Sequence, residues 1–460
     1  MKKIFLTTLF IAGFQFCNAQ NADSIMLRKI FAEAMSNGKS YKNLEHLCKG
    51  IGGRLSGSKQ AYEAVEYLQM LMKDVGADTA FKQPCMVPHW VRGAKEEGII
   101  YRKGTAPLPV NVCALGNSDA TPANGIKAPI IEIISWRQLD SIGKKGELKN
   151  KIIFYNRPMD PTLPSAGAAY GKAGDQRWAG ASRAAKYGAV GVVVRSLTHA
   201  HDMFPHTGAM GYVDSIKHIP ALAIATQDAD MLHYTLLGAA PVEFYMYDEC
   251  KMLPDELSYN VVGEIRGTEK PDEIITVGGH LDSWDLAEGA HDDGTGVMAS
   301  VEVLRILKAL GIKPKRTIRA VAFMNEENGS RGGKAYFEDA KQRNKKFIAA
   351  MESDGGGFTP LGFSIGGNNK NAIEKVSAWK KYFQHYSATN WNKGGNGGAD
   401  VGHLQPLNTC LIELDVDGQR YFDYHHTAND RFENVNQREL ELDGAMMTML
   451  IWLISEYGVE

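Results

Sequence analysis

From residue 258 onward, the chain alternates short apolar runs with segments of helical periodicity. The apolar runs VVGEI, IITVGG, RAVAFMN, FIAAMES, FSIGG and TCLIELD predict strands. Apolar residues at helical spacing predict helices over residues 296–310, 334–343, 371–386 and 437–456. Alternation of this kind is typical of a largely parallel sheet covered by helices. The pattern therefore predicts an α/β domain.

Residues from about 105 to 255 have a different pattern. The short apolar runs APIIEII, KIIFYN, GAVGVVVRS, IPALAIA and PVEFYMY alternate with turns, and one helix is predicted over residues 178–187. We interpret residues 106–256 as a compact, β-rich inserted module. It would separate an N-terminal part of the α/β domain, residues 20–105, from the larger part, residues 257–460.

The first residues, MKKIFLTTLFIAGFQFCNAQ, have the pattern of a signal peptide. Two lysines precede the apolar run from Ile4 to Phe14, which is too short to span a membrane. Small residues follow at Cys17 and Ala19, where signal peptidase prefers them. We therefore expect residues 1–19 to be cleaved after Ala19 and the mature protein to be exported, either to the periplasm or out of the cell.

Composition narrows the classes of partner. The 460 residues are 44% hydrophobic and 23% charged, which is typical of a soluble globular protein. The net charge of −2 provides no field for nucleic acid or for an anionic membrane, so we expect neither as a partner. A homodimer is left open. Both disulfides and buried free thiols are left open for the cysteines that remain after cleavage: Cys48, Cys85, Cys113, Cys250 and Cys410.

Histidines and acids recur where the predicted strands end. HLD follows IITVGG, NEEN follows RAVAF, ESD follows FIAAM, and HHTAND lies in a loop after the last strand. Taken singly, each motif is explained as a turn, a helix cap or a solvated pair. However, ligands of open α/β sheets bind at the carboxyl ends of strands. The recurrence of such motifs at several strand ends therefore predicts a functional site.

The residue types at these strand ends indicate a metal site. Imidazole and carboxylate ligands together suit Zn²⁺. Two histidines with at least three carboxylates exceed the needs of one tetrahedral zinc and predict two zinc ions that share a bridging carboxylate. Two dications would also offset the repulsion among the acids of GGHLDSWDLAEGAHDDGTG. The candidate ligands are His280, Asp292, Asp293, Glu326, Glu327, Asp354 and His426.

The motifs GGHLDSWD, GAHDDGTG, NEEN, MESD and HHTAND resemble those of the bacterial leucyl aminopeptidase-like zinc exopeptidases. RLSGS, VPHWVRG, KYGAVGVVVRS and PHTG are similar to the carboxypeptidase Q (plasma glutamate carboxypeptidase) branch of that family. The resemblance covers nearly the whole mature chain. It implies a three-layer α/β/α domain with a central, mostly parallel mixed sheet, and it implies that the β-rich insertion is a protease-associated domain.

The resemblance also implies a role for each site residue. Glu326 would be the general base and acid acting on a metal-bridging water, and Asp282 would hold the imidazole of His280. A cis peptide bond is implied between Asp292 and Asp293. The implied metal ligands are His280 and Asp354 for one zinc, Glu327 and His426 for the other, and Asp292 as the bridge.

Other residues near these motifs are candidates for substrate contacts. Asp400 is a candidate partner for the substrate amine or its side-chain pocket. Tyr424 or His425 is a candidate donor to the oxyanion, and His206 in PHTG would bring the inserted module over the cleft. His291 stands where the family often has Asn or Met, and we expect it to be exposed.

The expected function is that of an exported, zinc-dependent exopeptidase, an aminopeptidase or dipeptidase acting on dipeptides or short peptides with a free N-terminus. Two other functions are weighed against it. A glutaminyl-cyclase-like transferase would use one zinc, and a receptor-like homologue would have lost ligands. The complete ligand set and the inserted module favour the peptidase.

Overall fold

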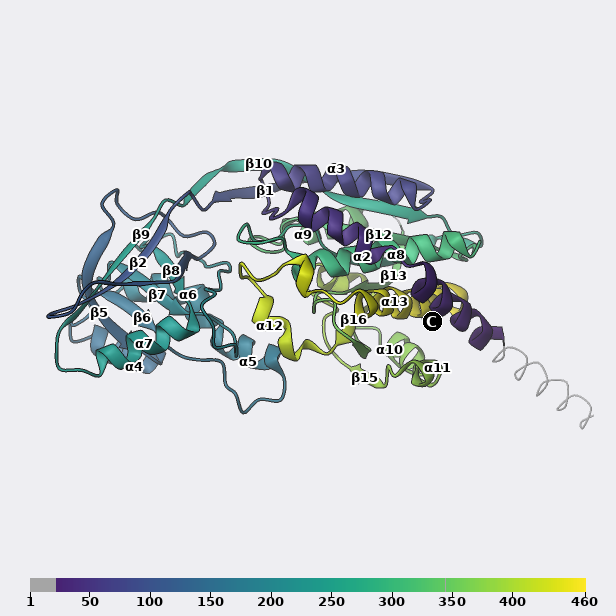
Figure 1. Cartoon of the computed structure of the whole chain (residues 1–460). Coiled ribbons are helices and arrows are strands. Elements are labelled where there is room, and N and C mark those ends of the chain that lie inside the picture. Colours follow the sequence, from purple (N-terminus) through teal and green to yellow (C-terminus); the bar gives the residue numbers. More distant parts are fainter. Residues whose placement is uncertain (1–21, 344) are drawn as a thin grey trace, which may run out of the picture.

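The computed structural model describes residues 22–343 and 345–460 and contains two sheets, each of which forms its own module (Figure 1). The predicted signal peptide and Cys17 lie outside the described residues. The first sheet has the strand order β1 (Thr79–Val91), β10 (Lys251–Ile265), β12 (Arg316–Phe323), β11 (Lys270–His280), β13 (Lys346–Glu352), β16 (Cys410–Val416), β14 (Pro360–Gly366) and β15 (Asn390–Lys393).

The centre of the first sheet is parallel. The pairs β12–β11, β11–β13, β13–β16 and β14–β15 are parallel, whereas β1–β10, β10–β12 and β14–β16 are antiparallel. Every residue of β12 is buried, because this strand lies within the sheet and is covered on both faces. The mixed, mostly parallel sheet predicted from the sequence is therefore confirmed.

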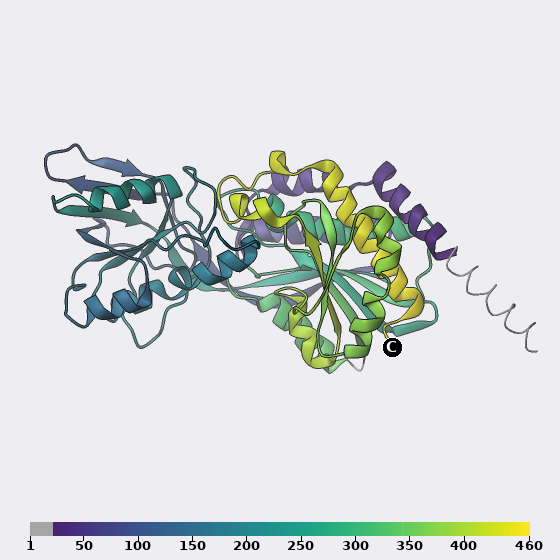
Figure 2. The same cartoon turned by 90° about the horizontal axis from the view of Figure 1, so that it is seen from below.

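Helices form a layer on each face of the first sheet (Figure 2). One layer contains α2 (Ser40–Glu45), α3 (Lys59–Asp74), α8 (Thr295–Ala309) and α13 (Gln437–Tyr457), which share the largest apolar core with the sheet. The other layer contains α9 (Arg331–Gln342) and the 3-10 helix Val401–Leu407. The expected helix over residues 371–386 is broken into α10 (Lys370–Ser377), α11 (Lys380–Phe383) and a 3-10 turn.

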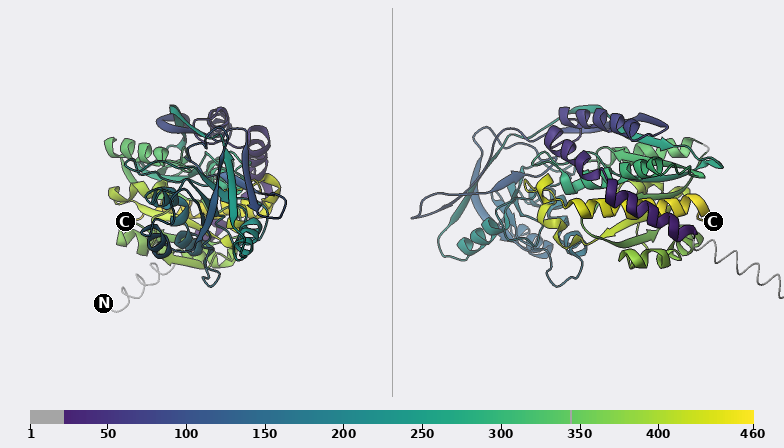
Figure 3. Two further views of the ribbon diagram at one scale, coloured as in Figure 1. Left: turned by 90° about the vertical axis from the view of Figure 1, so that its left-hand side faces the viewer. Right: turned by 45° about the vertical axis from the view of Figure 1, so that its right-hand side comes forward.

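A helix over residues 22–37 begins the described chain and lies beside α13 at the end of the molecule farthest from the second module (Figure 3). Asp23 accepts hydrogen bonds from the hydroxyl groups of Tyr382 and Tyr457, which anchor this helix. Among the residues that the structure describes, no helix combines the length and apolarity needed to cross a membrane.

The second module contains more helix than the sequence predicted. Its strands β5 (Ile126–Ile133), β6 (Ile152–Tyr155), β7 (Gly191–Arg195) and β8 (Ala221–Ile224) are parallel neighbours. The helices α4 (Trp136–Gly143), α5 (Ala166–Ala173) and α6 (Asp175–Ala185) lie between them in the chain, and α7 (Thr226–Leu236) follows β8. Helices α4 and α5 escaped prediction because each has only 8 residues, and α5 (AGAAYGKA) also has almost no large apolar residues. The sequence did not predict α7 either. The strand order of this sheet is β3 (Leu108–Val110), β2 (Glu96–Arg102), β9 (Val242–Asp248), β5 (Ile126–Ile133), β6 (Ile152–Tyr155), β7 (Gly191–Arg195), β8 (Ala221–Ile224) and β4 (Val112–Ala114).

The second module begins earlier than the expected boundary at residue 106. Strand β2 lies in the second sheet, where it pairs with β3 and β9. The chain enters this module after β1 ends at Val91 and leaves it along β10, so the antiparallel pair β1–β10 connects the two modules (Figure 1). β2 belongs to the second module because it pairs with β9, which is far away in sequence. Local periodicity does not reveal such pairing.

The cysteines of the described residues are free and buried. Cys48, Cys85, Cys113, Cys250 and Cys410 form no disulfide, so the structure supports the free-thiol alternative. Burial raises the pKa of the Cys85 thiol to about 12, which keeps this thiol protonated and unreactive.

Candidate metal centre

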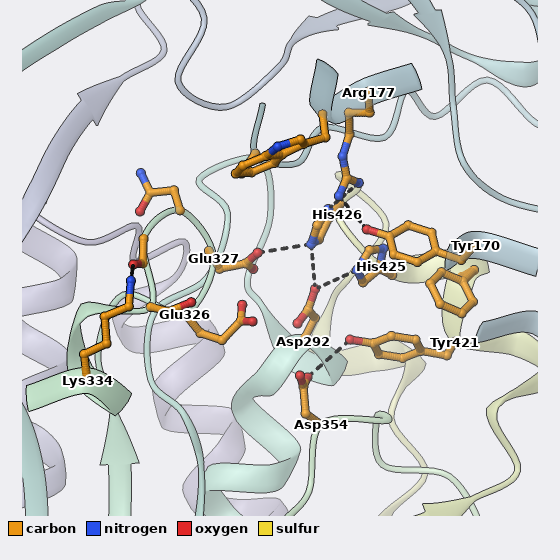
Figure 4. Close-up of a pocket in the computed structure, with 16 residues that line it drawn as sticks. Tyr170, Arg177, Asp292, Glu326, Glu327, Lys334, Asp354, Tyr421, His425 and His426 are labelled. Carbon is orange, nitrogen blue, oxygen red and sulfur yellow. Dashed lines mark hydrogen bonds and ion pairs between the residues drawn. The ribbon is translucent and has the colours of Figure 1, made fainter. Parts of the chain in front are cut away.

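The predicted ligands meet at one edge of the first sheet, and Figure 4 shows four of them: Asp292, Glu327, Asp354 and His426. His280 is the last residue of β11, Glu327 follows the end of β12, and Asp354 follows the end of β13. His426 lies in the loop after β16 and α12 (Tyr421–Tyr424). These central strands are parallel, so their carboxyl ends point to the same edge. Asp292 completes the group from the irregular turn Ala290–Gly294, which leads into α8.

Asp292 lies between two histidine–carboxylate pairs. Its Oδ1 atom is 3.1 Å from His280 Nε2, which is also 3.5 Å from Asp354 Oδ1. Its Oδ2 atom is 3.4 Å from His426 Nε2, which is also 3.1 Å from Glu327 Oε2. Asp292 Oδ2 and Glu327 Oε1 are buried without a hydrogen-bond partner. A pair of cations that share one bridging carboxylate needs such buried carboxylate oxygens without partners, close to the imidazole nitrogens of two histidines.

The charges of these groups are strongly coupled. Burial alone would lower the pKa of His280, but the carboxylates of Asp354 and Asp292 raise it well above its ordinary value. Burial, together with the charge of Asp292, raises the pKa of Glu327 well above the usual range of a carboxyl group. Burial also holds the pKa of His426 well below its ordinary value. Without a cation, these acids must be balanced by protons, and a dication would replace the protons.

Asp282 fixes the turn that carries the two adjacent glutamates. Its carboxylate accepts the backbone N–H groups of Glu326, at 3.0 Å, and of Glu327, at 3.3 Å. In Figure 4 the Glu327 carboxylate reaches His426, whereas that of Glu326 lines the cleft without a drawn contact. Burial raises the pKa of Glu326 to about 8. The neighbouring glutamates therefore occupy different environments.

Asp282 contacts the imidazole of His280 through its backbone oxygen. His280 Nδ1 lies 2.9 Å from the backbone oxygen of Asp282, while the Asp282 carboxylate is 4.0 Å away. Because the second nitrogen donates to this carbonyl, Nε2 is left to face Asp292 and Asp354. The Asp282 carboxylate instead supports the turn after β12.

The turn at Asp292 is supported from several sides. The peptide bond between Asp292 and Asp293 is cis, as the resemblance implied. The carboxylate of Asp430 accepts the N–H groups of His291 (2.7 Å) and Asp292 (3.1 Å). Asp293 accepts the N–H of His280 at 3.0 Å. A side chain at Gly279 would lie 2.9 Å from the backbone of α8, so the close approach of helix and strand requires glycine there.

Arg54, in the RLSGS motif, holds the loop between β11 and Asp292. Its guanidinium is buried and donates to the carbonyl oxygens of Leu281, Glu288 (2.6 Å) and Gly289 (2.9 Å). These carbonyls belong to a loop without regular structure and would otherwise be buried without partners. In the sequence, this motif was only part of a resemblance. In the structure, its arginine holds the loop by donating hydrogen bonds to these three carbonyl oxygens.

Of the four residues predicted to contact substrate, one lines the cleft and three do not. His425 lines the cleft, where its ring stacks on that of His426 with centroids 3.5 Å apart. Tyr424, Asp400 and His206 do not line the cleft. Both carboxylate oxygens of Asp400 are buried without partners. Tyr424 stacks on His291.

The expectation that His291 is exposed is wrong. Its side chain is fully buried, between Phe358 and Tyr424. Nδ1 accepts the N–H of Gly357 at 3.2 Å, and Nε2 lies 3.1 Å from the carbonyl oxygen of Asn434. Burial lowers the pKa of His291 to about 4, consistent with a neutral ring that accepts at one nitrogen and donates at the other.

Several cleft residues were missed by the sequence analysis. The cleft has a volume of about 560 Å³, and the second module contributes Tyr170, Arg177 and Trp178 to its lining. Tyr421 lines it from the first module and donates to Asp354 Oδ1 at 3.4 Å. Tyr421 had a usable signal, since it precedes the HHTAND motif. The residues of the second module had none, because they are far from every ligand in sequence.

Comparison with known proteins identifies the family. The profile of peptidase family M28 matches residues 260–451. The chain is 31% identical to carboxypeptidase Q of Bos taurus over 437 residues, which cover 95% of this chain and 89% of the relative. Carboxypeptidase Q of Xenopus laevis is 32% identical, with coverage of 91% and 86%. This chain belongs to peptidase family M28.

Solved structures agree with this membership. The M28 family member described here superimposes with a TM-score of 0.88 on the crystal structure of a peptidase M28 precursor from Shewanella amazonensis. The two are 33% identical over 95% of this chain and 97% of the other. A zinc aminopeptidase from Bacillus subtilis has the same fold, with a TM-score of 0.65, 18% identity, and coverage of 91% and 95%. The M28 family comprises metallopeptidases, so its chemistry is metal-assisted hydrolysis.

Proposed function

We propose that this protein is an exported zinc exopeptidase, an aminopeptidase or dipeptidase, that hydrolyses dipeptides or short peptides with a free N-terminus. One observation carries the proposal. Asp292 lies between two histidine–carboxylate pairs, while the carboxylate of Glu326 is left free in the cleft beside them. The signal-peptide pattern of residues 1–19 supports export.

The donor set fits two zinc ions. His280 and Asp354 would hold one ion and His426 and Glu327 the other, with Asp292 between them. When bound, zinc makes water acidic enough to ionise near neutral pH and polarises the carbonyl group of the scissile bond. The names of the relatives, carboxypeptidase Q and zinc aminopeptidase, are consistent with this chemistry.

The protein's own residues would provide the proton transfer and the positioning. Glu326 would accept a proton from the attacking water and return it to the leaving amine, as a carboxylate positioned in the cleft beside the metal ligands can do. Asp282 would keep Glu326 in place through its backbone N–H. Because the second module forms one wall, the cleft would exclude bulk water and accept only a short segment of peptide.

The proposal is tested with matched substrates. Unmodified dipeptides, N-acetylated dipeptides and longer peptides are incubated with the zinc-loaded protein, and zinc per chain is measured on the same sample. We expect hydrolysis of the free dipeptides, loss of turnover on N-acetylation, and about two zinc ions per chain. Equal cleavage of the acetylated substrate would exclude recognition of a free amine, and full activity with one zinc would exclude the two-metal site.

A further inference from the structure

We propose that the loop Pro205–Gly208 of the second module positions His426, so that half of the metal centre depends on the docking of the two modules. This inference rests on the two-metal site proposed above. The backbone N–H of Thr207 donates to the carbonyl oxygen of His426 at 3.0 Å. In return, His426 Nδ1 lies 3.3 Å from the carbonyl oxygen of Thr207. One residue of the second module therefore holds both the backbone and the ring of His426.

The hydrogen bond to the ring selects the nitrogen that faces the metal. A histidine that binds a metal through Nε2 carries its proton on Nδ1 and usually donates it to a carbonyl or carboxylate. The Thr207 carbonyl is placed to accept that proton. Arg177 Nη1 lies 3.4 Å from the same carbonyl oxygen and 3.4 Å from His426 Nδ1. A carbonyl oxygen has two lone pairs, so the Thr207 oxygen can accept both the Nδ1 proton and the Arg177 N–H. With the proton on Nδ1, the approach of Arg177 to Nδ1 is not a hydrogen bond, because both groups then donate.

The backbone of His426 also needs support. Its φ angle is 64°, in the left-handed region that residues other than glycine rarely occupy. Such a conformation persists only where the surroundings hold it. The N–H of Thr207 provides one such contact from the second module, and the indole of Trp284 packs edge-on against the imidazole with centroids 5.7 Å apart.

The positioning loop is itself firmly held. The hydroxyl of Thr207 donates to the carbonyl oxygen of Ala114 at 2.7 Å, and Arg92 donates to the same oxygen at 2.7 Å. Arg92 also donates to the carboxylate of Asp285, at 2.7 and 3.0 Å. Asp285 belongs to the loop between His280 and Asp292, so the buried Arg92 joins the two modules beside the metal centre.

The two halves of the proposed metal centre differ in which module holds the second nitrogen of the histidine. The second nitrogen of His280 is held by the Asp282 carbonyl of its own loop. The second nitrogen of His426 is held by Thr207, which lies 219 positions earlier in the chain and in the other module. Zinc binding by His280 and Asp354 is thus built within the first module, whereas binding by His426 and Glu327 requires the second.

The substitution Gly208→Ala tests this role. A Cβ atom at Gly208 would lie 2.6 Å from His426 Nδ1 and would also meet Arg177. Gly146→Ala is the matched control, since Gly146 is in the same module, also has positive φ (76°), and has open space around its Cβ position. Zinc binding is measured on the full chain by titration against a competing chelator. The melting temperature of the metal-free protein is measured alongside.

We expect wild type and Gly146→Ala to bind two zinc ions with the same affinities. Gly208→Ala should bind one zinc about 10–100-fold more weakly, as substitutions behind a metal-bound histidine do, with the other zinc unchanged. The double variant Gly208→Ala/Arg177→Ala should keep the defect, because the contact with His426 remains. If the double variant regains wild-type zinc affinity, the defect arises from the clash with Arg177 and not from displacement of His426. That result would overturn the positioning role of the loop.

Two further outcomes separate this inference from the proposed function. Two zinc ions bound with unchanged affinities by folded Gly208→Ala would overturn the positioning role alone. If the variant His426→Gln binds two zinc ions as tightly as wild type, the proposed metal centre is overturned as well. If Gly208→Ala does not fold, Asp285→Asn weakens the Arg92 link instead. It should weaken the same zinc site several-fold, and unchanged zinc binding in that variant would also contradict the inference.

Discussion

At the scale of single residues, the two glutamates of the NEEN motif show how neighbours of the same type acquire different environments. The Asp282 carboxylate accepts both of their backbone N–H groups. Glu327 then approaches His426 at 3.1 Å, while Glu326 lines the cleft. With this shared anchor but different side-chain contacts, one residue would bind metal while the other would move protons.

The two glutamates are expected to respond differently to the same substitution. Glu326→Gln should lower kcat by about 10²–10⁴-fold, because a proton carrier is lost while KM and zinc content stay near those of wild type. Glu327→Gln should lower zinc occupancy at one site, and excess zinc should partly restore activity. Zinc content and kcat are measured for both variants in one buffer. Loss of zinc from Glu326→Gln alone would reverse the two assignments.

His291 shows a second residue-scale effect, that of a buried neutral histidine. The variant His291→Phe keeps an aromatic ring beside Phe358 but leaves the N–H of Gly357 and the carbonyl of Asn434 without partners. We expect a loss of stability of about 2 kcal/mol, the cost of unsatisfied buried polar groups. Thermal unfolding measures this loss. His385→Phe, at an exposed position, is the control, and an equal change in both variants would contradict the structural role.

At the scale of elements, α13 contains a buried acid that does not belong to the metal centre. Asp443 is 1% exposed, and its Oδ1 atom has no hydrogen-bond partner. Burial raises the pKa of this carboxyl group well above its ordinary value, and the charge of Glu439 adds to the effect. A carboxyl group that stays protonated in the folded state favours folding at low pH and opposes it as the pH rises.

Asp443→Asn should therefore change how stability depends on pH. The unfolded chain loses the Asp443 proton near pH 4, whereas the folded chain keeps it to a higher pH. The stability contributed by this group is thus present below pH 4 and is lost as the pH rises towards the folded-state pKa, by at most about 1.4 kcal/mol per pH unit. Melting temperatures of variant and wild type, compared from pH 5 to pH 8, should diverge in favour of Asn. A constant difference would show that Asp443 ionises normally.

At the scale of the whole molecule, the metal centre concentrates negative charge where two modules meet. Burial raises the pKa of Glu326 and of Glu352 to about 8, and that of Asp430 to about 7. In the metal-free protein, these groups keep protons that the unfolded chain has already lost near pH 4–5. Folding of the metal-free protein is therefore increasingly opposed as the pH rises from about 5 to 8.

Removal of zinc should destabilise the molecule, and more strongly at higher pH. Bound cations stabilise the ionised carboxylates, so the zinc-loaded protein should lose less stability than the metal-free protein between pH 5 and pH 8. Melting temperatures are measured with and without a chelator across this range, and zinc is added back as the control. A melting temperature that does not respond to chelation at pH 8 would contradict the proposed charge balance.

The sequence by itself determined the α/β character of the first module and named the histidines and acids that meet at its sheet edge. These features follow from local periodicity and from the rule that parallel strands end at one edge. His280, Glu327 and Asp354 could be named because each follows an apolar run directly. His426 could be named only as part of a motif in a loop.

Only the tertiary structure decided the surroundings of these residues. The burial of His291, the placement of β2 in the second sheet, and the contribution of Tyr170 and Arg177 to the cleft all depend on segments that are distant in sequence. The hydrogen bonds between Thr207 and His426 have the same origin. The type of each ligand and the apolar run that it follows are encoded locally, whereas burial and hydrogen-bond partners arise from packing between distant segments and have no local signal.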